Sequence, residues 1–243
     1  MTLLIGVSSA WSNETWGEDT ANPHGYIYTD QPYAQAIYRS GAVPLLLAPP
    51  VDKLSAAALS DLAATVLDSV NGLLLTGGGG ARRFKPEHMP GLQEQQPLRY
   101  RYEMHLIREA WRRRMPVLGF CRGHQMMAEV LGGKIRKQPV SGHQQPADAI
   151  TAHSVDLVAQ SMLSEITGTL RWEVNSYHCQ VVETVPADFQ VCARSPEGWI
   201  EAMEAATGPF WLGCQFHPEL LFDDDQKARS VFERFIARSG RRI

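Results

Sequence analysis

Cysteine is scarce in this 243-residue chain, and its spacing excludes two classes of protein. The four cysteines are Cys121, Cys179, Cys192 and Cys214. No two of them form a CxxC pair or another zinc-ligand spacing, so the sequence predicts no metal site. Four cysteines over this length also do not resemble a disulfide framework. The expected location is a reducing cytoplasm, and Cys192 and Cys214, which fall in apolar strand patterns, are expected in the core.

Positive charge and long apolar runs are lacking as well. The formal net charge is −3, which indicates no basic surface for nucleic acid. No apolar run approaches the roughly 18 residues that a membrane-spanning helix needs. Residues 1–7 are apolar but short and lack a basic region, which predicts a first strand and not a signal peptide. We therefore expect neither a nucleic-acid partner nor a membrane partner.

The composition is that of an ordinary globular protein. Hydrophobic residues make up 44% of the chain and charged residues 20%, and there is no internal repeat or low-complexity tract. Single α/β domains of this size are routine and can bury a sizeable core without disulfides or metals. We therefore expect one domain that spans residues 1–243.

Apolar runs alternate with helical patterns in the first half of the chain, which is typical of βα units and a parallel sheet. Strands are expected at residues 3–7, 43–47, 73–75, 117–120 and 210–216. Helices are expected at residues 32–40, 55–69, 102–113, 124–130 and 226–237. Shorter alternating segments predict further strands at residues 154–158, 172–174, 190–193 and 199–203. The sequence thus predicts a three-layer α/β fold with a mostly parallel central sheet flanked by helices and a small antiparallel extension. Residues 81–98 show no periodicity and are interpreted as a long connection of the kind that forms a substrate lid.

The sharpest local signal is the segment Gly119-Phe120-Cys121-Arg122-Gly123. It follows an apolar strand and precedes a helix, as in a nucleophile elbow that carries cysteine in place of serine. Both glycines are needed because side chains there would collide with neighbouring backbone. An isolated cysteine is usually a small buried hydrophobe, but the amino end of a helix favours the thiolate. Cys121 is the predicted nucleophile, and the backbone N–H of Arg122 is a predicted oxyanion donor.

A cysteine nucleophile needs a histidine base that a third group orients. His217 follows an apolar strand at the edge of the sheet where α/β proteins place their chemistry, and Pro218 keeps the strand from pairing further. In an extended chain residues i and i+2 point to the same side. Glu219 is therefore predicted to hold the His217 imidazole.

Residues 77–80 form a run of four glycines after a short buried strand. One interpretation is a phosphate-binding loop, but the lysine and the serine or threonine of a P-loop are absent. The other is a second oxyanion donor at a strand end, and we predict Gly78 or Gly79 for this role.

Together these segments resemble the class I glutamine amidotransferase-like family, in particular its γ-glutamyl hydrolase branch, which includes γ-glutamyl-γ-aminobutyrate hydrolases. The motifs that carry the resemblance are LTGGG at 75–79, GFCRGHQ at 119–125, LGG at 131–133, VNSYH at 174–178 and QFHPE at 215–219. The resemblance spans nearly the whole chain. It implies a flavodoxin-like fold, no cofactor, and a homodimer as a possible assembly.

The resemblance also implies a reaction and its contacts. Cys121 would form a γ-glutamyl thioester, and His217 would protonate the leaving amine and then activate water. Gln125, Asn175, Ser176 and His178 would be substrate contacts, although His178 is equally well interpreted as a structural histidine bonded to backbone.

Basic residues stand where the branch usually carries acidic ones, in segments 79–84 and 98–102. Arg82, Arg83, Arg99 or Arg101 could face a carboxylate on the leaving amine, or simply be solvated. The His-His-Gln of the family is His178-Cys179-Gln180 here. These departures leave the leaving-group pocket open while the predicted catalytic residues are intact.

Three functions are compatible with these motifs. The first is a free-standing hydrolase of a small γ-glutamyl amide, such as γ-glutamyl-γ-aminobutyrate, with that small molecule as its only required partner. The second is the glutaminase subunit of an amidotransferase that delivers ammonia to a partner synthase. The third is a binding or regulatory module without catalysis, which the presence of Cys121, His217 and Glu219 disfavours.

Overall fold

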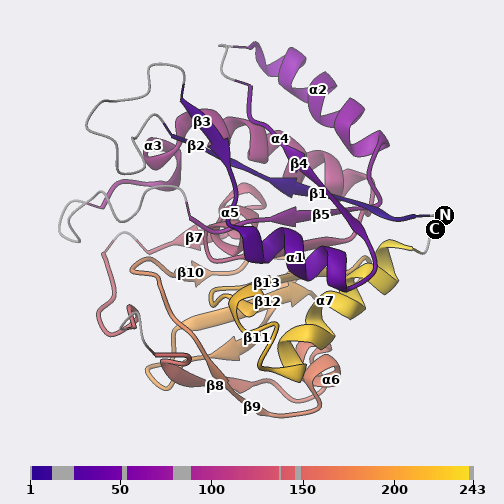
Figure 1. Ribbon diagram of the computed structural model, residues 1–243. Helices are drawn as coiled ribbons and strands as arrows, with labels where there is room; N and C mark the ends of the chain where they lie inside the picture. Colours follow the sequence, from indigo (N-terminus) through magenta and orange to yellow (C-terminus); the bar gives the residue numbers. More distant parts are fainter. Residues whose placement is uncertain are drawn as a thin grey trace.

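The computed structural model describes residues 2–12, 25–50, 54–78, 89–136, 138–145 and 149–240. A mixed β-sheet of eleven strands runs through the molecule, and helices cover both of its faces (Figure 1). The two ends of the described chain lie close together at one side.

The first half of the sheet is parallel. Its strands are β4 (Val43–Leu47), β1 (Leu4–Ser8), β5 (Gly72–Leu75), β6 (Val117–Phe120) and β13 (Trp211–Cys214), in that spatial order. Numbered along the chain, these five strands follow the order 2-1-3-4-5, which is that of flavodoxin-like folds. The predicted parallel sheet and its flavodoxin-like class are confirmed.

The second half of the sheet is antiparallel and confirms the predicted extension. It continues from β13 through β12 (Ile200–Ala205), β11 (Phe189–Arg194), β8 (His153–Leu157) and β9 (Arg171–Val174). The sequence did not predict β7 (Lys134–Ile135) and β10 (Val182–Thr184), nor the separate ribbon of β2 (Ala10–Ser12) and β3 (Tyr26–Tyr28). These strands have only two or three residues, too few to show a period of two.

The five predicted helices are present as α1 (Gln31–Arg39), α2 (Ala56–Asp68), α4 (Pro97–Arg112), α5 (Arg122–Val130) and α7 (Gln226–Ser239). Two short helices, α3 (Leu92–Gln95) and α6 (Met162–Thr167), were not predicted. The interpretation of residues 81–98 as a connection without structure is wrong for residues 92–95 and 97–98, which are helical; residues 79–88 lie outside the described ranges. Pro97 occupies the first turn of α4, where its missing N–H costs nothing, so the proline begins the helix instead of breaking the chain.

Two hydrophobic cores form because successive residues of a buried strand point to opposite faces. Leu74 packs on the face that α1 and α7 cover, in a cluster with Ile37, Phe232 and Phe235. Leu73 and Leu75 pack on the other face, against residues of α2, α4 and α5. Cys192 and Cys214 are fully buried, as predicted.

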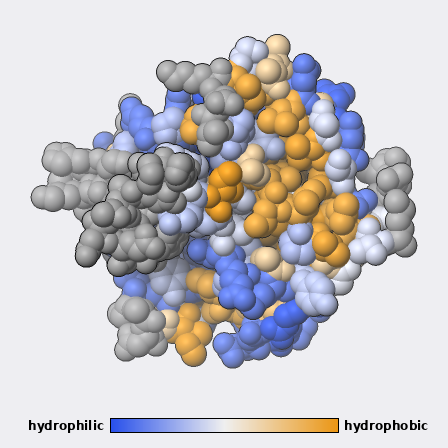
Figure 2. Space-filling view, turned by 45° about the horizontal axis from the view of Figure 1, so that its top comes forward, coloured by the Kyte–Doolittle hydropathy of each residue, from blue (hydrophilic) through white to orange (hydrophobic). Residues whose placement is uncertain are grey.

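The edge strand β4 leaves apolar side chains in contact with solvent. Val43, Leu45 and Leu46 are 40%, 42% and 51% exposed, and Figure 2 shows a broad apolar area on the face turned toward the viewer. Such areas are typical of contact surfaces, but a single chain does not test the homodimer, which stays a prediction. Among the described residues, no helix combines the length and the apolar character that crossing a membrane requires.

Candidate active site

The carboxyl ends of three neighbouring parallel strands bring the predicted catalytic residues together. Gly77 follows β5, Cys121 follows β6 and His217 follows β13. A side-chain carbon placed on Gly77 would lie 2.8 Å from Cε1 of His217 and 3.2 Å from Cβ of Cys121. Residues from three distant parts of the sequence therefore meet at one point on the sheet edge where α/β folds bind their ligands.

Cys121 occupies a strained turn between β6 and α5. Its φ of 49° and ψ of −106° lie in a region that side chains rarely adopt, and its N–H donates to the Cys214 carbonyl at 2.8 Å. A Cβ on Gly123 would stand 2.2 Å from the Leu75 carbonyl oxygen, and one on Gly119 would stand 3.0 Å from the Gly123 carbonyl carbon. The predicted need for both glycines is confirmed. A strained backbone such as that of Cys121 is found at functional sites.

His217 and Glu219 form a short hydrogen bond. The Nδ1 atom of His217 lies 2.5 Å from Oε1 of Glu219, and both residues are buried. The local geometry differs from the expectation of an extended chain, because Pro218–Leu220 is a turn of 3-10 helix. Pro218 is the first residue of that turn, and the turn, rather than strand alternation, directs the carboxylate back to the ring. The bond leaves Nε2 as the nitrogen that can serve Cys121.

The surroundings of His217 favour its charged form. Burial alone would lower the pKa of His217, but the charges of Glu219 and of the Cys121 thiolate, with hydrogen bonds to both, raise it well above its usual value. An imidazolium beside a thiolate is the ion pair in which a cysteine attacks and a histidine already holds the proton for the leaving group.

Asn175 holds the backbone of His217 from both sides. Its Nδ2 donates to the His217 carbonyl at 2.8 Å, and its Oδ1 accepts from the His217 N–H at 2.8 Å. Asn175 is only 1% exposed. The residue predicted to touch substrate is thus placed to position the base, and its substrate contact stays a prediction.

Tyr33 of α1 belongs to the site, although the sequence did not point to it. Its hydroxyl lies 3.4 Å from Nδ1 of His217 and accepts the Gly77 N–H at 2.8 Å. Burial, and next the charge of Glu219, raise the pKa of Tyr33 well above its usual value, so the hydroxyl stays protonated. No short-range signal could have found it, because 184 residues separate Tyr33 from His217.

Arg99 binds the backbone of the loop that carries Thr76 and Gly77. It donates through Nη2 to the Thr76 carbonyl at 2.7 Å and through Nη1 to the Gly77 carbonyl at 3.1 Å. Its charge is paired with Glu103 at 2.7 Å, and Ser8 also donates to that carboxylate at 2.7 Å. The interpretation of Arg99 as a leaving-group contact or a solvated residue is wrong, since it is 1% exposed and bonded inside the protein.

The other arginines of the basic segments are placed differently. Arg101 donates to the Leu54 carbonyl at 2.6 Å, just before the start of α2. Arg82 and Arg83 lie outside the described residues.

Two of the three predicted oxyanion donors can be located. The N–H of Arg122 is the first of helix α5 and so one of the four that have no acceptor within a helix. Gly78 has a φ of +71°, and nothing lies within 4 Å of where its Cβ would be. Gly79 lies outside the described residues. The N–H of Gly77 is already bonded to Tyr33, which leaves Gly78 and Arg122 as the predicted donors on either side of Cys121.

The remaining predicted substrate contacts are buried and bonded to protein atoms. Nε2 of Gln125 donates to the Gln180 carbonyl at 2.8 Å and to Oε1 of Gln215 at 3.0 Å. Ser176 donates to the His143 carbonyl at 2.8 Å, and Nδ1 of His178 lies 3.2 Å from the Gln180 carbonyl. These bonds fit the alternative that His178 is a structural histidine, and substrate contact by these residues stays a prediction.

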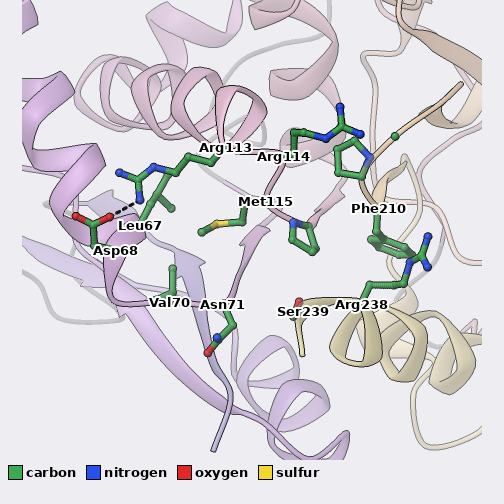
Figure 3. A pocket seen from close by; sticks show the side chains of 13 residues that line it. Leu67, Asp68, Val70, Asn71, Arg113, Arg114, Met115, Phe210, Arg238 and Ser239 are labelled. Carbon is green, nitrogen blue, oxygen red and sulfur yellow. Dashed lines mark hydrogen bonds and ion pairs between the residues drawn. The ribbon is translucent and has the colours of Figure 1, made fainter. Parts of the chain in front are cut away.

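A separate hollow of about 650 Å³ lies at the opposite edge of the sheet. Its lining includes Asn71 before β5, Pro116 before β6 and Phe210 before β13, which places it at the amino ends of the strands. Figure 3 shows Arg113 paired with Asp68 at one side of it and Arg238 of α7 at the other. The catalytic candidates all follow the carboxyl ends of the same strands, so this hollow is not their substrate site.

Comparisons with known proteins identify the family of this chain. The sequence profile of the peptidase C26 family matches residues 3–219. The chain is 33% identical over 227 residues, 90% of this chain and 70% of the relative, to a Mycobacterium tuberculosis protein whose name assigns it provisionally to the glutamine amidotransferases. It is 30% identical over 229 residues, 88% of this chain and 87% of the relative, to the γ-glutamyl-γ-aminobutyrate hydrolase of Escherichia coli O157:H7.

A solved structure shows the same fold. The glutamine amidotransferase of Thermotoga maritima aligns with a TM-score of 0.61 and 17% identity, covering 98% of this chain and 96% of the other. The family profile matches well over half of the chain and includes the elbow, His217 and Glu219. The chain therefore belongs to the peptidase C26 family of class I glutamine amidotransferase-like hydrolases.

Proposed function

We propose that this protein hydrolyses the γ-glutamyl amide bond of a small molecule such as γ-glutamyl-γ-aminobutyrate, with Cys121 as nucleophile, His217 as acid and base, and Glu219 as the group that orients the base. The observation that carries the proposal is the meeting of a strained cysteine elbow with the His217–Glu219 pair, whose atoms are 2.5 Å apart, around Gly77.

The proposed reaction has two halves. The Cys121 sulfur attacks the γ-carbonyl carbon, and the N–H groups of Gly78 and Arg122 stabilise the oxyanion. The carbon–nitrogen bond then breaks while Nε2 of His217 gives its proton to the leaving amine, which leaves a γ-glutamyl thioester on Cys121. Water attacks the thioester as Nε2 takes one of its protons, the carbon–sulfur bond breaks, and glutamate leaves.

The alternative is a glutaminase subunit that passes ammonia to a partner synthase, and sequence relatives with amidotransferase names support it. An assay with the purified chain distinguishes the two. The hydrolase proposal expects release of γ-aminobutyrate from γ-glutamyl-γ-aminobutyrate without a partner, with poor activity on glutamine. Turnover of glutamine only when a second protein is added would contradict it and support the alternative.

Replacing Glu219 with glutamine should lower kcat by about 10²-fold, because the base remains but loses its orienting carboxylate. It should also lower the pKa of His217, since the charge of Glu219 is the largest contribution that raises it. The limb of the pH–kcat/KM profile on which His217 loses its proton should therefore move to lower pH. Glu233→Gln, at an exposed position of α7, is the control and should leave the profile unchanged. A profile of Glu219→Gln that coincides with that of the wild type would contradict the role given to Glu219.

Replacing Asn175 with alanine separates positioning of the base from substrate binding. If Asn175 positions His217, kcat should fall by about 10- to 100-fold with little change in KM, because small displacements of a catalytic group are costly. A substrate contact would instead raise KM. Asn71→Ala is the matched control. The Asn71 side chain also bonds to backbone, because its Oδ1 accepts from the Leu4 N–H at 2.9 Å, but it lies at the opposite edge of the sheet. A rise in KM with unchanged kcat would restore the prediction of a substrate contact.

A further inference from the structure

Three histidines and a glutamate meet in the antiparallel half of the sheet, outside the catalytic residues. They are His143, His153, His178 and Glu201, and one side-chain nitrogen or oxygen of each lies within 4.8 Å of those of the others. The backbone assembles them, because the His178 N–H donates to the His143 carbonyl at 2.9 Å and His153 begins β8. Segments far apart in sequence thus direct four potential metal ligands toward one point.

The distances between the Glu201 carboxylate and the three histidines fit tetrahedral coordination of one ion. Oε1 of Glu201 lies 3.5 Å from Nδ1 of His143, 3.8 Å from Nε2 of His153 and 3.7 Å from Nε2 of His178. Zinc bonds to nitrogen and oxygen of 2.0–2.2 Å at tetrahedral angles separate the ligand atoms by about 3.4 Å. The three distances from the Glu201 oxygen thus lie within a few tenths of an ångström of the tetrahedral value, and all four ligand atoms lie within 4.8 Å of one another.

The second nitrogen of two of the rings has the hydrogen-bond partner that a metal-binding histidine requires, and that of the third faces a carboxylate. Nδ1 of His153 lies 3.1 Å from the Ser154 carbonyl and Nδ1 of His178 lies 3.2 Å from the Gln180 carbonyl. Because a carbonyl only accepts, these Nδ1 atoms carry the ring proton, and Nε2 of each ring presents a lone pair. Nε2 of His143 faces the Glu197 carboxylate at 3.8 Å. Outer partners of this kind orient the rings of histidines that bind metals.

The inner atoms of the cluster have no such partners. Nδ1 of His143, Nε2 of His153, Nε2 of His178 and both carboxylate oxygens of Glu201 are buried without a hydrogen-bond partner within the described ranges. Glu201 is fully buried and His178 is 4% exposed. Buried polar atoms of native proteins nearly always have partners, and a single shared proton could satisfy only one pair of these. These four side chains place acceptor atoms around one point, which is the arrangement that binds a cation.

We propose that His143, His153, His178 and Glu201 form a closed structural site for one Zn²⁺ ion. Imidazole and carboxylate donors in a tetrahedral arrangement suit zinc, whereas magnesium and calcium take sets of six or more oxygens. All four positions are filled by protein side chains, three of them buried and that of His153 13% exposed, as in structural sites, which leave no position for substrate. The spacing rules applied to cysteine do not detect this site, because its ligands are histidines and a glutamate dispersed over residues 143–201.

The ion would stabilise the segment around Asn175 that positions His217. His178 lies three residues after Asn175, which holds the His217 backbone, and the ring of Tyr177 packs edge-on against that of His217 with centroids 5.7 Å apart. The backbone carbonyl of Glu201 accepts from the Gln215 N–H at 2.7 Å, two residues before His217. The site therefore stabilises the two segments on either side of the base without contacting the nucleophile.

Metal content and zinc affinity of the full chain test the proposal. The protein is purified without a histidine tag, stripped with a chelator, and titrated with Zn²⁺ against a chromophoric competitor. We expect one tightly bound zinc ion per chain and a higher Tm on zinc addition. Glu201→Gln and His153→Gln should each weaken zinc binding at least 100-fold, since loss of an outer partner alone typically costs 10- to 100-fold, and should abolish the rise in Tm.

Two controls separate this site from other zinc binding. Cys121→Ala should bind zinc as the wild type does, which excludes the thiol and His217 as the site. His105→Gln should also bind it unchanged, because that histidine contacts Ser60 on the surface, away from the cluster. If Glu201→Gln does not fold, His153→Gln, whose side chain is 13% exposed, still tests the site. The proposal is overturned if the chain binds no zinc. It is also overturned if zinc binding is unchanged in Glu201→Gln or in His153→Gln, or if it is lost in Cys121→Ala.

Discussion

Replacing Cys121 with alanine is expected to lower kcat for γ-glutamyl-γ-aminobutyrate by about 10⁴-fold or more. Without the sulfur no thioester forms, and only substrate binding and the oxyanion donors remain to accelerate attack by water. The fold should survive, because alanine keeps the Cβ of cysteine and must adopt the same φ of 49°. The measurement is steady-state release of γ-aminobutyrate, with circular dichroism and Tm as checks of folding.

Cys179→Ala is the matched control for this result. Cys179 is also a free cysteine, but it is 6% exposed and its thiol has a pKa raised by burial. Its replacement should leave kcat within about threefold of the wild-type value, because nothing in the proposed reaction uses it. Cys121 is the cysteine with partial solvent exposure. Iodoacetamide should therefore label it first, and activity should fall in proportion to the labelled fraction of Cys121. Activity of Cys121→Ala within tenfold of wild type would refute the nucleophile assignment.

Local signals made the nucleophile and its base predictable from the sequence. Cys121 and its two glycines fall within five consecutive residues, and His217 and Glu219 are two residues apart. Each pattern follows an apolar strand, so the edge of the sheet on which it lies could also be predicted. The physical reason given for the His217–Glu219 contact was nevertheless wrong, since a 3-10 turn and not an extended chain brings them together.

The supporting residues were not predictable, because their contacts join distant parts of the chain. The Tyr33 contact with His217 spans 184 residues, and the contact of Asn175 with His217 spans 42. Arg99 was interpreted as a contact for the leaving amine or as a solvated residue of a basic segment, whereas the fold buries it and it donates to the Thr76 and Gly77 carbonyls. Pairwise contacts of this kind depend on how strands are ordered in the sheet, which periodicity does not determine.

Gly123 is where the fold and the site constrain each other most severely, and replacing it with alanine should damage both. The new Cβ would stand 2.2 Å from the Leu75 carbonyl oxygen and 2.6 Å from its carbon. Both atoms are backbone of the central strand β5, so no side-chain rotation relieves the overlap. We expect destabilisation of about 3 kcal/mol, at the upper end of typical overpacking, and a fall in Tm of roughly 6–12 °C for a domain of this size.

The same replacement should lower activity in the fraction that remains folded. Helix α5 must move away from β5 to admit the methyl group, and that movement displaces Cys121 and the Arg122 N–H relative to Gly77. A displacement of about 1 Å costs roughly 10²-fold in rate. Gly91→Ala is the matched control. Gly91 has a φ of −63°, and the nearest neighbour of a Cβ added there would be Glu94 Oε2, at 3.9 Å. This replacement should change the free energy of unfolding by less than about 1 kcal/mol. Equal Tm values for Gly123→Ala and Gly91→Ala would mean that β5 and α5 are not in the close contact on which the elbow depends.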